Sequence, residues 1–337
     1  MEEDILKDIV EDLNISIKEN GKFIKLYYDD YEPVEINKSN FHDIKDLNSE
    51  NRIAFIDGGN CEILKAPNFS LQFIRIYYTI YKNNKRVENK RYEFYLLIKS
   101  FSKDNNILYK TKTFGGNLID EIEFDSFDKT ISQGNNRADI SFVGNVARRF
   151  SELSIAKEIL DKLEKNDAVV FDGSLEAKYT HEEKILDELF EKAAKKDIVL
   201  MGLSKTCELL TDKGNSIIGV LAEMQDDGVW FYNPIAKINK KFDIYFAKLN
   251  RQSSYIFRID STKRDDKIFS MLKSNSTDPI FFGYPYALIE ADKFARVTNK
   301  ELEIFKTKFM MKAGKDWKKI SYFLKSNDAH SILDNIG

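Results

Sequence analysis

The chain has 337 residues, 42% of them apolar and 32% charged, with a formal net charge of −3. Such a chain can bury one large core or two modest ones, and it has no global positive field to attract nucleic acid or a membrane. With only two cysteines and three histidines, and no signal-like or membrane-spanning apolar stretch, it predicts a cytoplasmic protein without membrane contact, disulfide framework or zinc site.

Residues 1–50 are mainly polar and open with apolar residues at helical spacing. These apolar positions are Ile5, Ile9, Val10 and Leu13. Their spacing predicts an amphipathic helix, which an irregular lead-in follows. We therefore divide the chain into a helical N-terminal region, 1–50, that serves dimer or partner contacts, and a main domain, 51–337.

Beyond Arg52 the pattern changes to strands that are rich in aromatic and β-branched residues. Three of them form an antiparallel meander, and a polar turn at 82–85 joins the second to the third. After a polar stretch, helical and strand patterns alternate. The expected elements are strands at 53–57, 68–81 and 91–101, a helix at 139–164, a strand at 168–171, a helix at 181–196 and a strand at 197–205.

The order β-β-β-α-β-α-β, with acids on the first strand, first helix and fourth strand, is the ribonuclease H-like plan. We therefore predict an α/β fold with a mixed sheet flanked by helices, and an added antiparallel β region at 216–260. The strands expected there are 217–224, 229–232 and 255–260. Two helices close the chain: Thr298 and Glu301 form a capping box before the first, and Gly314 separates it from the second.

Two apolar runs end in the same phrase, Asp-Gly, at Asp57 and Asp172. An aspartate that ends a buried strand places a carboxylate at the sheet edge, and the following glycine bends the chain away. Either motif alone is more often a simple turn. On neighbouring strands, however, two such carboxylates can share a divalent metal ion.

The helix at 139–164 carries several acids, which helical geometry separates. At ~100° per residue, Glu152 projects from the face that packs on the sheet, whereas Glu158 lies on roughly the opposite, solvated side. An acid on a packing face is unfavourable unless it meets a cation. A metal ion held by Asp57 and Asp172 would supply that cation.

Three clustered carboxylates repel one another unless a metal neutralises them. Two Mn²⁺ or Mg²⁺ ions about 3.5–4 Å apart could activate a water molecule and stabilise the leaving oxygen of a phosphodiester. In this arrangement Asp57 bridges the two ions, and Glu152 and Asp172 complete their coordination shells.

The chain contains five short motifs, in this order: AFIDGGN at 54–60, VVFDGSL at 169–175, GLSK at 202–205, FRID at 257–260 and GYPYALIEAD at 283–292. From about residue 50 to its end, the chain thereby resembles the NurA nucleases. The resemblance implies a Mn²⁺-dependent, ribonuclease H-like nuclease that forms a dimeric ring. It also implies cleavage of single-stranded DNA, and of double-stranded DNA from the 5′ end, alongside a hexameric HerA translocase that processes broken DNA ends.

Position by position, the resemblance assigns the metal-binding acids to Asp57, Glu152 and Asp172. It places Lys205 where a cation could hold the scissile phosphate or stabilise transition-state charge, and Tyr284 where a tyrosine is important for activity. Relatives often carry histidine where this chain has Asp292. We interpret Asp292 as a fourth metal ligand, although the change could equally signal a weakened site.

Basic residues beside the acidic cluster are candidates for DNA contacts. Arg148 and Arg149 lie one turn before the helix acid, where they could hold backbone phosphates, and Lys205 is a third candidate. A ring that threads DNA needs only an inner lining of positive charge, so the acidic net charge is compatible with this function.

Two further features have less definite roles. The segment 306–325 interleaves lysines with aromatic residues, which serve either base stacking or, as we favour, core packing beside a solvated lysine face. Arg258 and Asp260 belong to a recurrent motif, and a buried ion pair is the simplest interpretation.

Two other functions stay open. An ATPase or sugar kinase of the actin-like superfamily shares the core fold, and IDGGN imitates its first phosphate hairpin, but its later Gly-Gly adenosine motif is missing. Alternatively, a NurA-like subunit with a degenerate site could regulate or scaffold the translocase without cutting DNA.

Overall fold

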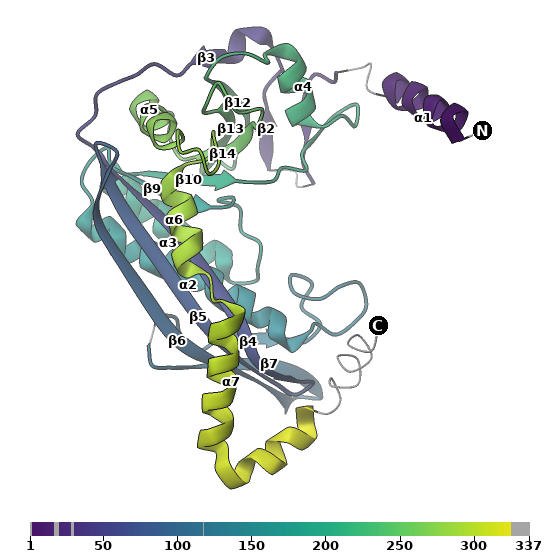
Figure 1. The fold of residues 1–337 in the computed structure, drawn as a ribbon, viewed down its shortest axis with the longest axis vertical. Coiled ribbons are helices and arrows are strands. Elements are labelled where there is room, and N and C mark those ends of the chain that lie inside the picture. Colours follow the sequence, from purple (N-terminus) through teal and green to yellow (C-terminus); the bar gives the residue numbers. More distant parts are fainter. Residues whose placement is uncertain (1, 17–19, 28–29, 117, 325–337) are drawn as a thin grey trace.

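The computed structural model describes residues 2–16, 20–27, 30–116 and 118–324 (Figure 1). Twelve strands of the described residues form one mixed sheet. They are β2 (Tyr31–Pro33), β3 (Phe41–Asp43), β4 (Arg52–Ala66), β5 (Phe69–Lys82), β6 (Lys85–Lys103), β7 (Asn106–Phe114), β8 (Glu123–Asp125), β9 (Ala168–Asp172), β10 (Val199–Ser204), β12 (Trp230–Ile238), β13 (Phe242–Lys248) and β14 (Phe257–Ser261). Two further strands, β1 (Ile24–Lys25) and β11 (Leu210–Thr211), pair separately.

The spatial order is β2-β12-β13-β14-β10-β9-β4-β5-β6-β7-β8, and β3 pairs with β12 beside this path. β9 runs parallel to both β4 and β10, whereas the other neighbours are antiparallel. The sheet therefore combines an antiparallel meander, β4 to β6, with a parallel centre that needs helical crossovers.

The helices connect and cover these strands. They are α1 (Glu2–Ser16), α2 (Val143–Lys162), α3 (Glu182–Lys195), α4 (Ile217–Met224), α5 (Asp266–Asn275), α6 (Tyr286–Ala295) and α7 (Asn299–Ala313). Helical residues continue at 317–324 after a 3₁₀ turn, Gly314–Asp316. In Figure 1, α6 and α7 follow one another across the long strands. No helix of the described part is both long and apolar enough to cross a membrane.

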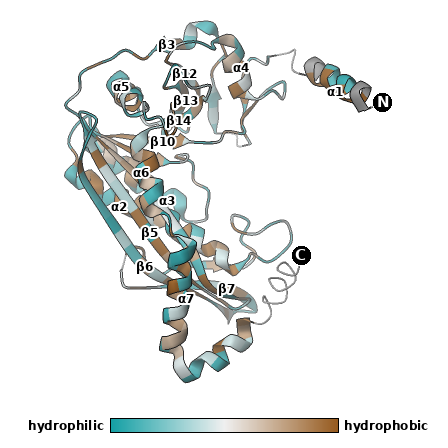
Figure 2. Cartoon of the chain, in the orientation of Figure 1, coloured by the Kyte–Doolittle hydropathy of each residue, from teal (hydrophilic) through white to brown (hydrophobic). Residues whose placement is uncertain are grey.

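Successive residues of the central strands enter different cores. In β4, Ala54 and Ile56 join the core that includes residues of α2 and α3. Ile53 and Phe55 join a second core, which includes residues of α5 and α6. Because both faces are covered by helices, the central strands read as uninterrupted apolar runs. Hydrophobic residues accordingly recur along the long strands (Figure 2).

The prediction that β4 ends at Asp57 is wrong. The strand continues to Ala66 because β5 pairs with it over nearly its whole length. β9, in contrast, pairs with β4 only from Ile53 to Ile56. From Asp57 onward, β4 therefore has no strand partner on this side among the described residues. Of the two Asp-Gly motifs, only the one at Asp172 ends a strand.

Other predictions also need correction. The apolar segment 217–224 is helix α4 rather than a strand, because Ser216 caps it and Ile217, Val220 and Leu221 lie buried at helical spacing. The expected irregular lead-in contains β1, β2 and β3, which extend the two sheets. β7, β8, β13, α5 and α6 were not anticipated. At the C-terminus, the capping box before α7 is confirmed, and Gly314 is the C-cap.

Helix α1 agrees with the amphipathic pattern of the sequence. Its apolar residues Ile5, Leu6, Ile9 and Val10 are all exposed. A helix with such an unburied apolar face gains little from packing within this chain.

Gly59 allows α6 to lie directly against β4. A Cβ added there would be 2.3 Å from the carbonyl oxygen of Ala295, a backbone atom that cannot rotate away. We expect Gly59→Ala to lower the free energy of unfolding by ~1–3 kcal/mol, as for an overpacked core. Urea denaturation measures this change.

Gly219→Ala is the matched control, because its added Cβ would meet only Ser216 at 3.8 Å within helix α4. It should leave stability unchanged or raise it slightly, since alanine favours helices. Equal stability of the two variants would contradict the proposed contact.

Candidate metal centre

Three aspartates from three different elements meet at one place. Asp57 lies within β4, Asp172 ends β9, and Asp292 lies on α6. One carboxylate oxygen from each lies within 4.8 Å of the others. Side chains separated by more than 100 residues in sequence thus form one cluster of oxygen atoms.

The sheet register brings the first two together. Ile56 pairs with Phe171 as the last partners of the parallel ladder, so Asp57 and Asp172 are the next residue on each strand. After Asp172 the chain leaves the sheet at Gly173, whose φ of +119° favours glycine and whose N–H donates to the carbonyl of Leu203.

The third aspartate is positioned by the anchoring of α6. Glu290, two residues earlier on α6, is buried and accepts hydrogen bonds from the hydroxyls of Tyr77 and Tyr81, each at 2.7 Å. Arg86 completes the group at 3.1 Å. This cluster attaches α6 to β5 and thereby presents Asp292 to the other two aspartates.

Lys205 and Tyr284, which the sequence predicted as site residues, contact the same cluster. The ammonium of Lys205 lies 2.5 Å from Asp172 and 3.7 Å from Asp292. The hydroxyl of Tyr284 donates to Asp172 at 3.3 Å. Burial opposes the charge of Lys205, but the carboxylates of Asp172, Asp292 and Asp57 together outweigh it and raise the pKa of Lys205. Burial, then the charge of Asp172, raises the pKa of Tyr284.

The charges of the cluster favour a cation. Burial, together with the nearby carboxylates of Glu152 and Asp172, raises the pKa of Asp57 to about 8. Such repulsion is relieved by a metal ion. Carboxylate oxygens are hard ligands that suit Mg²⁺ or Mn²⁺. Asp57, Asp172 and Asp292 therefore fit a hard divalent metal.

Glu152 lies close to the three aspartates without joining their group in the described structure. It is 4% exposed, as its predicted place on the packing face requires. Its carboxylate forms ion pairs with Arg148 at 2.6 Å and Arg149 at 3.7 Å. Burial raises the pKa of Glu152, and the two arginines oppose that effect. A Cβ on Gly58 would lie 2.6 Å from its Oε1, so glycine is needed between the acid and β4.

The two arginines are placed differently. Arg149 is buried, and its guanidinium contacts Glu182 at 2.8 Å and the carbonyl of Ser174 at 3.0 Å. The prediction that it holds DNA phosphates does not agree with this position, because its donors already bind inside the protein. Arg148 is 31% exposed and donates to the carbonyl of Gly58. It therefore stays a candidate for a phosphate contact.

Arg258 and Asp260 form the buried ion pair that the sequence suggested, at 2.7 Å. Arg258 also contacts Glu176 at 2.9 Å, and Asp260 accepts a hydrogen bond from the backbone N–H of Leu175. Both partners belong to the loop after Asp172. The ion pair therefore fixes the loop that begins directly after Asp172.

The C-terminal aromatic residues support the core-packing interpretation. Phe305, Phe309 and Trp317 pack against buried residues of β4 and β5, including Phe73. Tyr322 and Phe323 of the same segment are instead exposed, so only part of the aromatic set packs against the core. Lys325, the last lysine of this segment, lies outside the described residues.

The pH dependence of stability tests the state of Asp57. An unfolded aspartate titrates near ~3.9, whereas the pKa of Asp57 in the metal-free folded protein is about 8. The stabilising effect of the bound proton is complete below the unfolded pKa and is lost as the pH rises through the folded pKa. In chelator, we expect Asp57→Asn to become more stable than the wild type above pH ~4. By pH ~8 its advantage should reach on the order of 5 kcal/mol.

Denaturation curves at several pH values measure this difference. Added Mn²⁺ should reduce it, because the metal stabilises only the charged carboxylate. Asp161→Asn is the control: Asp161 is an acid of α2 that pairs with Lys192 on the surface and has a lowered pKa. Its pH dependence should have the opposite sign. A pH-independent difference for Asp57→Asn would contradict the raised pKa.

Comparison with known proteins assigns the chain to a family. The crystal structure of the NurA nuclease from Sulfolobus solfataricus matches with a TM-score of 0.54 at 14% identity, over 93% of this chain and 95% of that one. At that identity the match shows the fold. Endonuclease V of Ciona intestinalis in complex with DNA has a TM-score of 0.38 at 10% identity, over 76% and 87%.

Curated proteins yield no match. The family model described as the NurA domain covers residues 51–297, a span that includes all three clustered aspartates. The chain therefore belongs to the NurA family.

Proposed function

We propose that this protein is a metal-dependent deoxyribonuclease that hydrolyses phosphodiester bonds at the Asp57, Asp172 and Asp292 cluster. The approach of their three carboxylates to within 4.8 Å carries the proposal, because such a group needs a cation and suits phosphoryl chemistry. Membership of the NurA family supports it. The sheet order β6-β5-β4-β9-β10, with α2 and α3 as crossovers, supports a ribonuclease H-like core.

The metal would be Mn²⁺ or Mg²⁺, and we propose two ions. The three aspartates would hold these ions, which when bound supply an activated water molecule and stabilise the charge that develops at the phosphate. Glu152 would provide a further carboxylate if Arg148 exchanged its ion pair for a DNA phosphate. Lys205 would stay beside the reacting phosphate and stabilise its negative charge.

Tyr284 would orient Asp172 through its hydroxyl, which donates a hydrogen bond to that carboxylate. Its own raised pKa keeps the phenol protonated, so it acts as a donor throughout. This role is one of positioning.

The substrates that we propose follow from the family. They are single-stranded DNA, cut internally and from the 5′ end, and double-stranded DNA degraded from the 5′ end. A HerA-type hexameric translocase would deliver the DNA during end resection and repair, and the nuclease would work as a homodimer. The exposed apolar face of α1 supports a role in protein contacts.

Replacement of Asp57 tests the nuclease proposal. Asp57→Ala should lower Mn²⁺-dependent cleavage of end-labelled single-stranded DNA by at least ~100-fold while the protein stays folded. Asp161→Asn, on the outer side of α2, should retain wild-type activity. A wild-type protein that hydrolyses ATP and leaves DNA intact would favour the kinase-like alternative. A protein that does neither but binds the translocase would favour a scaffold.

The aspartate of α6 tests the proposed ligand set. Asp292→Ala should weaken Mn²⁺ binding by at least the ~10-fold expected when a hydrogen-bond partner of a metal ligand is lost. Asp292→His should restore much of it, because imidazole also binds Mn²⁺. Calorimetric Mn²⁺ titration measures both. Lys293→Ala, at the exposed neighbouring position, is the control. Unchanged affinity in Asp292→Ala would remove Asp292 from the metal centre.

A further inference from the structure

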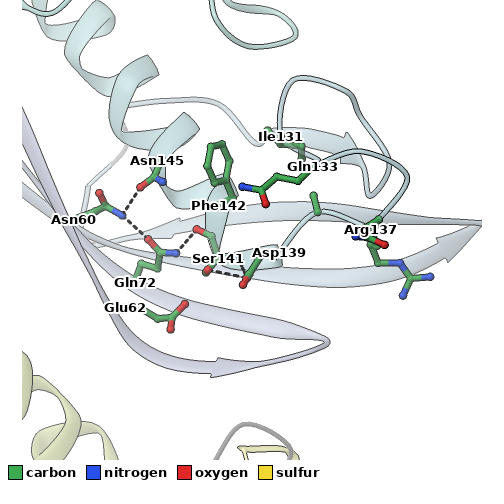
Figure 3. Close-up of a pocket in the computed structure, with 12 residues that line it drawn as sticks. Asn60, Glu62, Gln72, Ile131, Gln133, Arg137, Asp139, Ser141, Phe142 and Asn145 are labelled. Carbon is green, nitrogen blue, oxygen red and sulfur yellow. Dashed lines mark hydrogen bonds between the residues drawn. The ribbon is translucent and has the colours of Figure 1, made fainter. Parts of the chain in front are cut away.

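A polar cavity of about 580 Å³ lies beside the unpaired part of β4 (Figure 3). Its walls come from β4, β5, the loop at 131–139 and the start of α2. Asn60 lies three residues beyond Asp57, which is ~10 Å along an extended strand. Asn145 lies one helical turn before Arg148. Successive side chains of a strand point to opposite faces, so Asn60 faces the α2 side of the sheet and Asp57 the α6 side. Beyond Ile56 the edge of β4 has no partner on the β9 side among the described residues. A single DNA strand that passes round this edge could therefore reach the metal centre and the cavity together.

Hydrogen bonds between amides fix one wall of this cavity. The amide nitrogen of Asn60 donates to Oε1 of Gln72 at 2.9 Å and to Oδ1 of Asn145 at 3.2 Å. The amide nitrogen of Gln72 donates to the carbonyl of Ser141 at 2.7 Å. Figure 3 shows these bonds as a continuous chain. Asn60 and Asn145 are thereby held in one orientation without a ligand.

Gln72 is an unusual residue for its position. It is 1% exposed on β5, between the apolar residues Leu71 and Phe73. A buried amide is unfavourable unless it is hydrogen-bonded. It also needs room: a Cβ on Gly144 would lie 1.8 Å from its Oε1. The glycine and the buried amide together support the polar wall at some thermodynamic cost.

The wall leaves several polar atoms available to a ligand. Among the described residues, no hydrogen-bond partner is found for Oδ1 of Asn60, for the amide nitrogen of Asn145 or for the side chain of Gln133. All three residues line the cavity. Together they offer an acceptor and several donors, which is the pattern that asparagine and glutamine use to bind the edge of a nucleobase.

The remaining lining residues favour a base over a phosphate. The half-buried ring of Phe142 lies in the cavity and offers a stacking surface (Figure 3). The carboxylates of Glu62 and Asp139 also line it. Asp139 already pairs with Lys65 and accepts hydrogen bonds from Ser141. Glu62 would repel a phosphate but can accept a hydrogen bond from the exocyclic amine of a base. Arg137 lies at the other end of the cavity, where a backbone phosphate could bind.

We propose that this cavity binds one unpaired nucleobase of the DNA strand whose phosphate lies at the metal centre. The inference rests on the proposed nuclease function and deepens it. A base can enter such a cavity only when it has left the duplex stack. The cavity therefore selects DNA that is single-stranded beside the cleaved bond.

Cleavage of single-stranded DNA with abasic substitutions tests this site. In the wild type with Mn²⁺, a single abasic nucleotide should lower kcat/KM by about 10-fold at one position near the cut. In Asn145→Ala, the intact substrate should be cut about 10-fold less efficiently, and the same abasic nucleotide should cause no further loss. Abasic nucleotides elsewhere should have the same effect in both proteins. Asn89→Ala, at an exposed position of β6, should behave as the wild type.

Asn145→Ala should fold normally because alanine is the best helix former. DNA binding without cleavage gives a second measurement. In chelator, Asp57→Asn should bind an intact strand more tightly than an abasic strand of equal length, and adding Asn145→Ala should reduce this ratio by about 10-fold.

If the protein cuts DNA but no abasic position affects the wild type and Asn145→Ala differently, and if the binding ratio is also unchanged, the base site is overturned and the nuclease proposal stands. A wild type that cuts no DNA would overturn the nuclease proposal. In that case the binding ratio would still decide whether the cavity binds a base.

Discussion

The proposed chemistry depends on the unequal lengths of two parallel neighbours. β4 and β9 stay paired as far as Ile56 and Phe171, after which β9 leaves the sheet while β4 continues on β5. Asp57 and Asp172 therefore lie side by side at a point where one strand ends and space opens beside the other. Helix α6 brings Asp292 to this space from one face, and α2 brings Glu152 from the other.

Charge compensation is the second constraint on this centre. Without a metal, Lys205 lies between Asp172 and Asp292, and Arg148 neutralises Glu152. These ion pairs lower the cost of gathering acids in a poorly solvated place. Among the described residues, Asp57 has no such partner at hydrogen-bonding distance, since only the backbone N–H of Gly58 donates to it. Its pKa is accordingly raised, and it is the group that a metal ion would stabilise most.

Much of the central sheet could be predicted from sequence, because buried strands and amphipathic helices differ in the period of their apolar residues. The meeting of Asp57 and Asp172 was also predicted, whereas the continuation of β4 beyond Asp57 was not, because it depends on the pairing with β5. The burial of Glu152 followed from helical geometry. The helix at 217–224 could not be separated from a strand, because an eight-residue apolar run has too little periodicity. The cluster of Glu290 and the cavity around Asn60 depend on contacts between distant segments. The one local signal for that cavity was Gln72, a polar residue inside an apolar strand.

The same unpaired edge of β4 has a consequence for solubility. Exposed strand edges can pair with edges of other molecules and so seed aggregates. Here the pairing of β4 with β5 shifts register between Glu62 and Leu64, and the edge carries Glu62 and Lys65. A bulge and charged side chains are known protections against such pairing. This edge can thus stay open to a substrate without recruiting foreign strands.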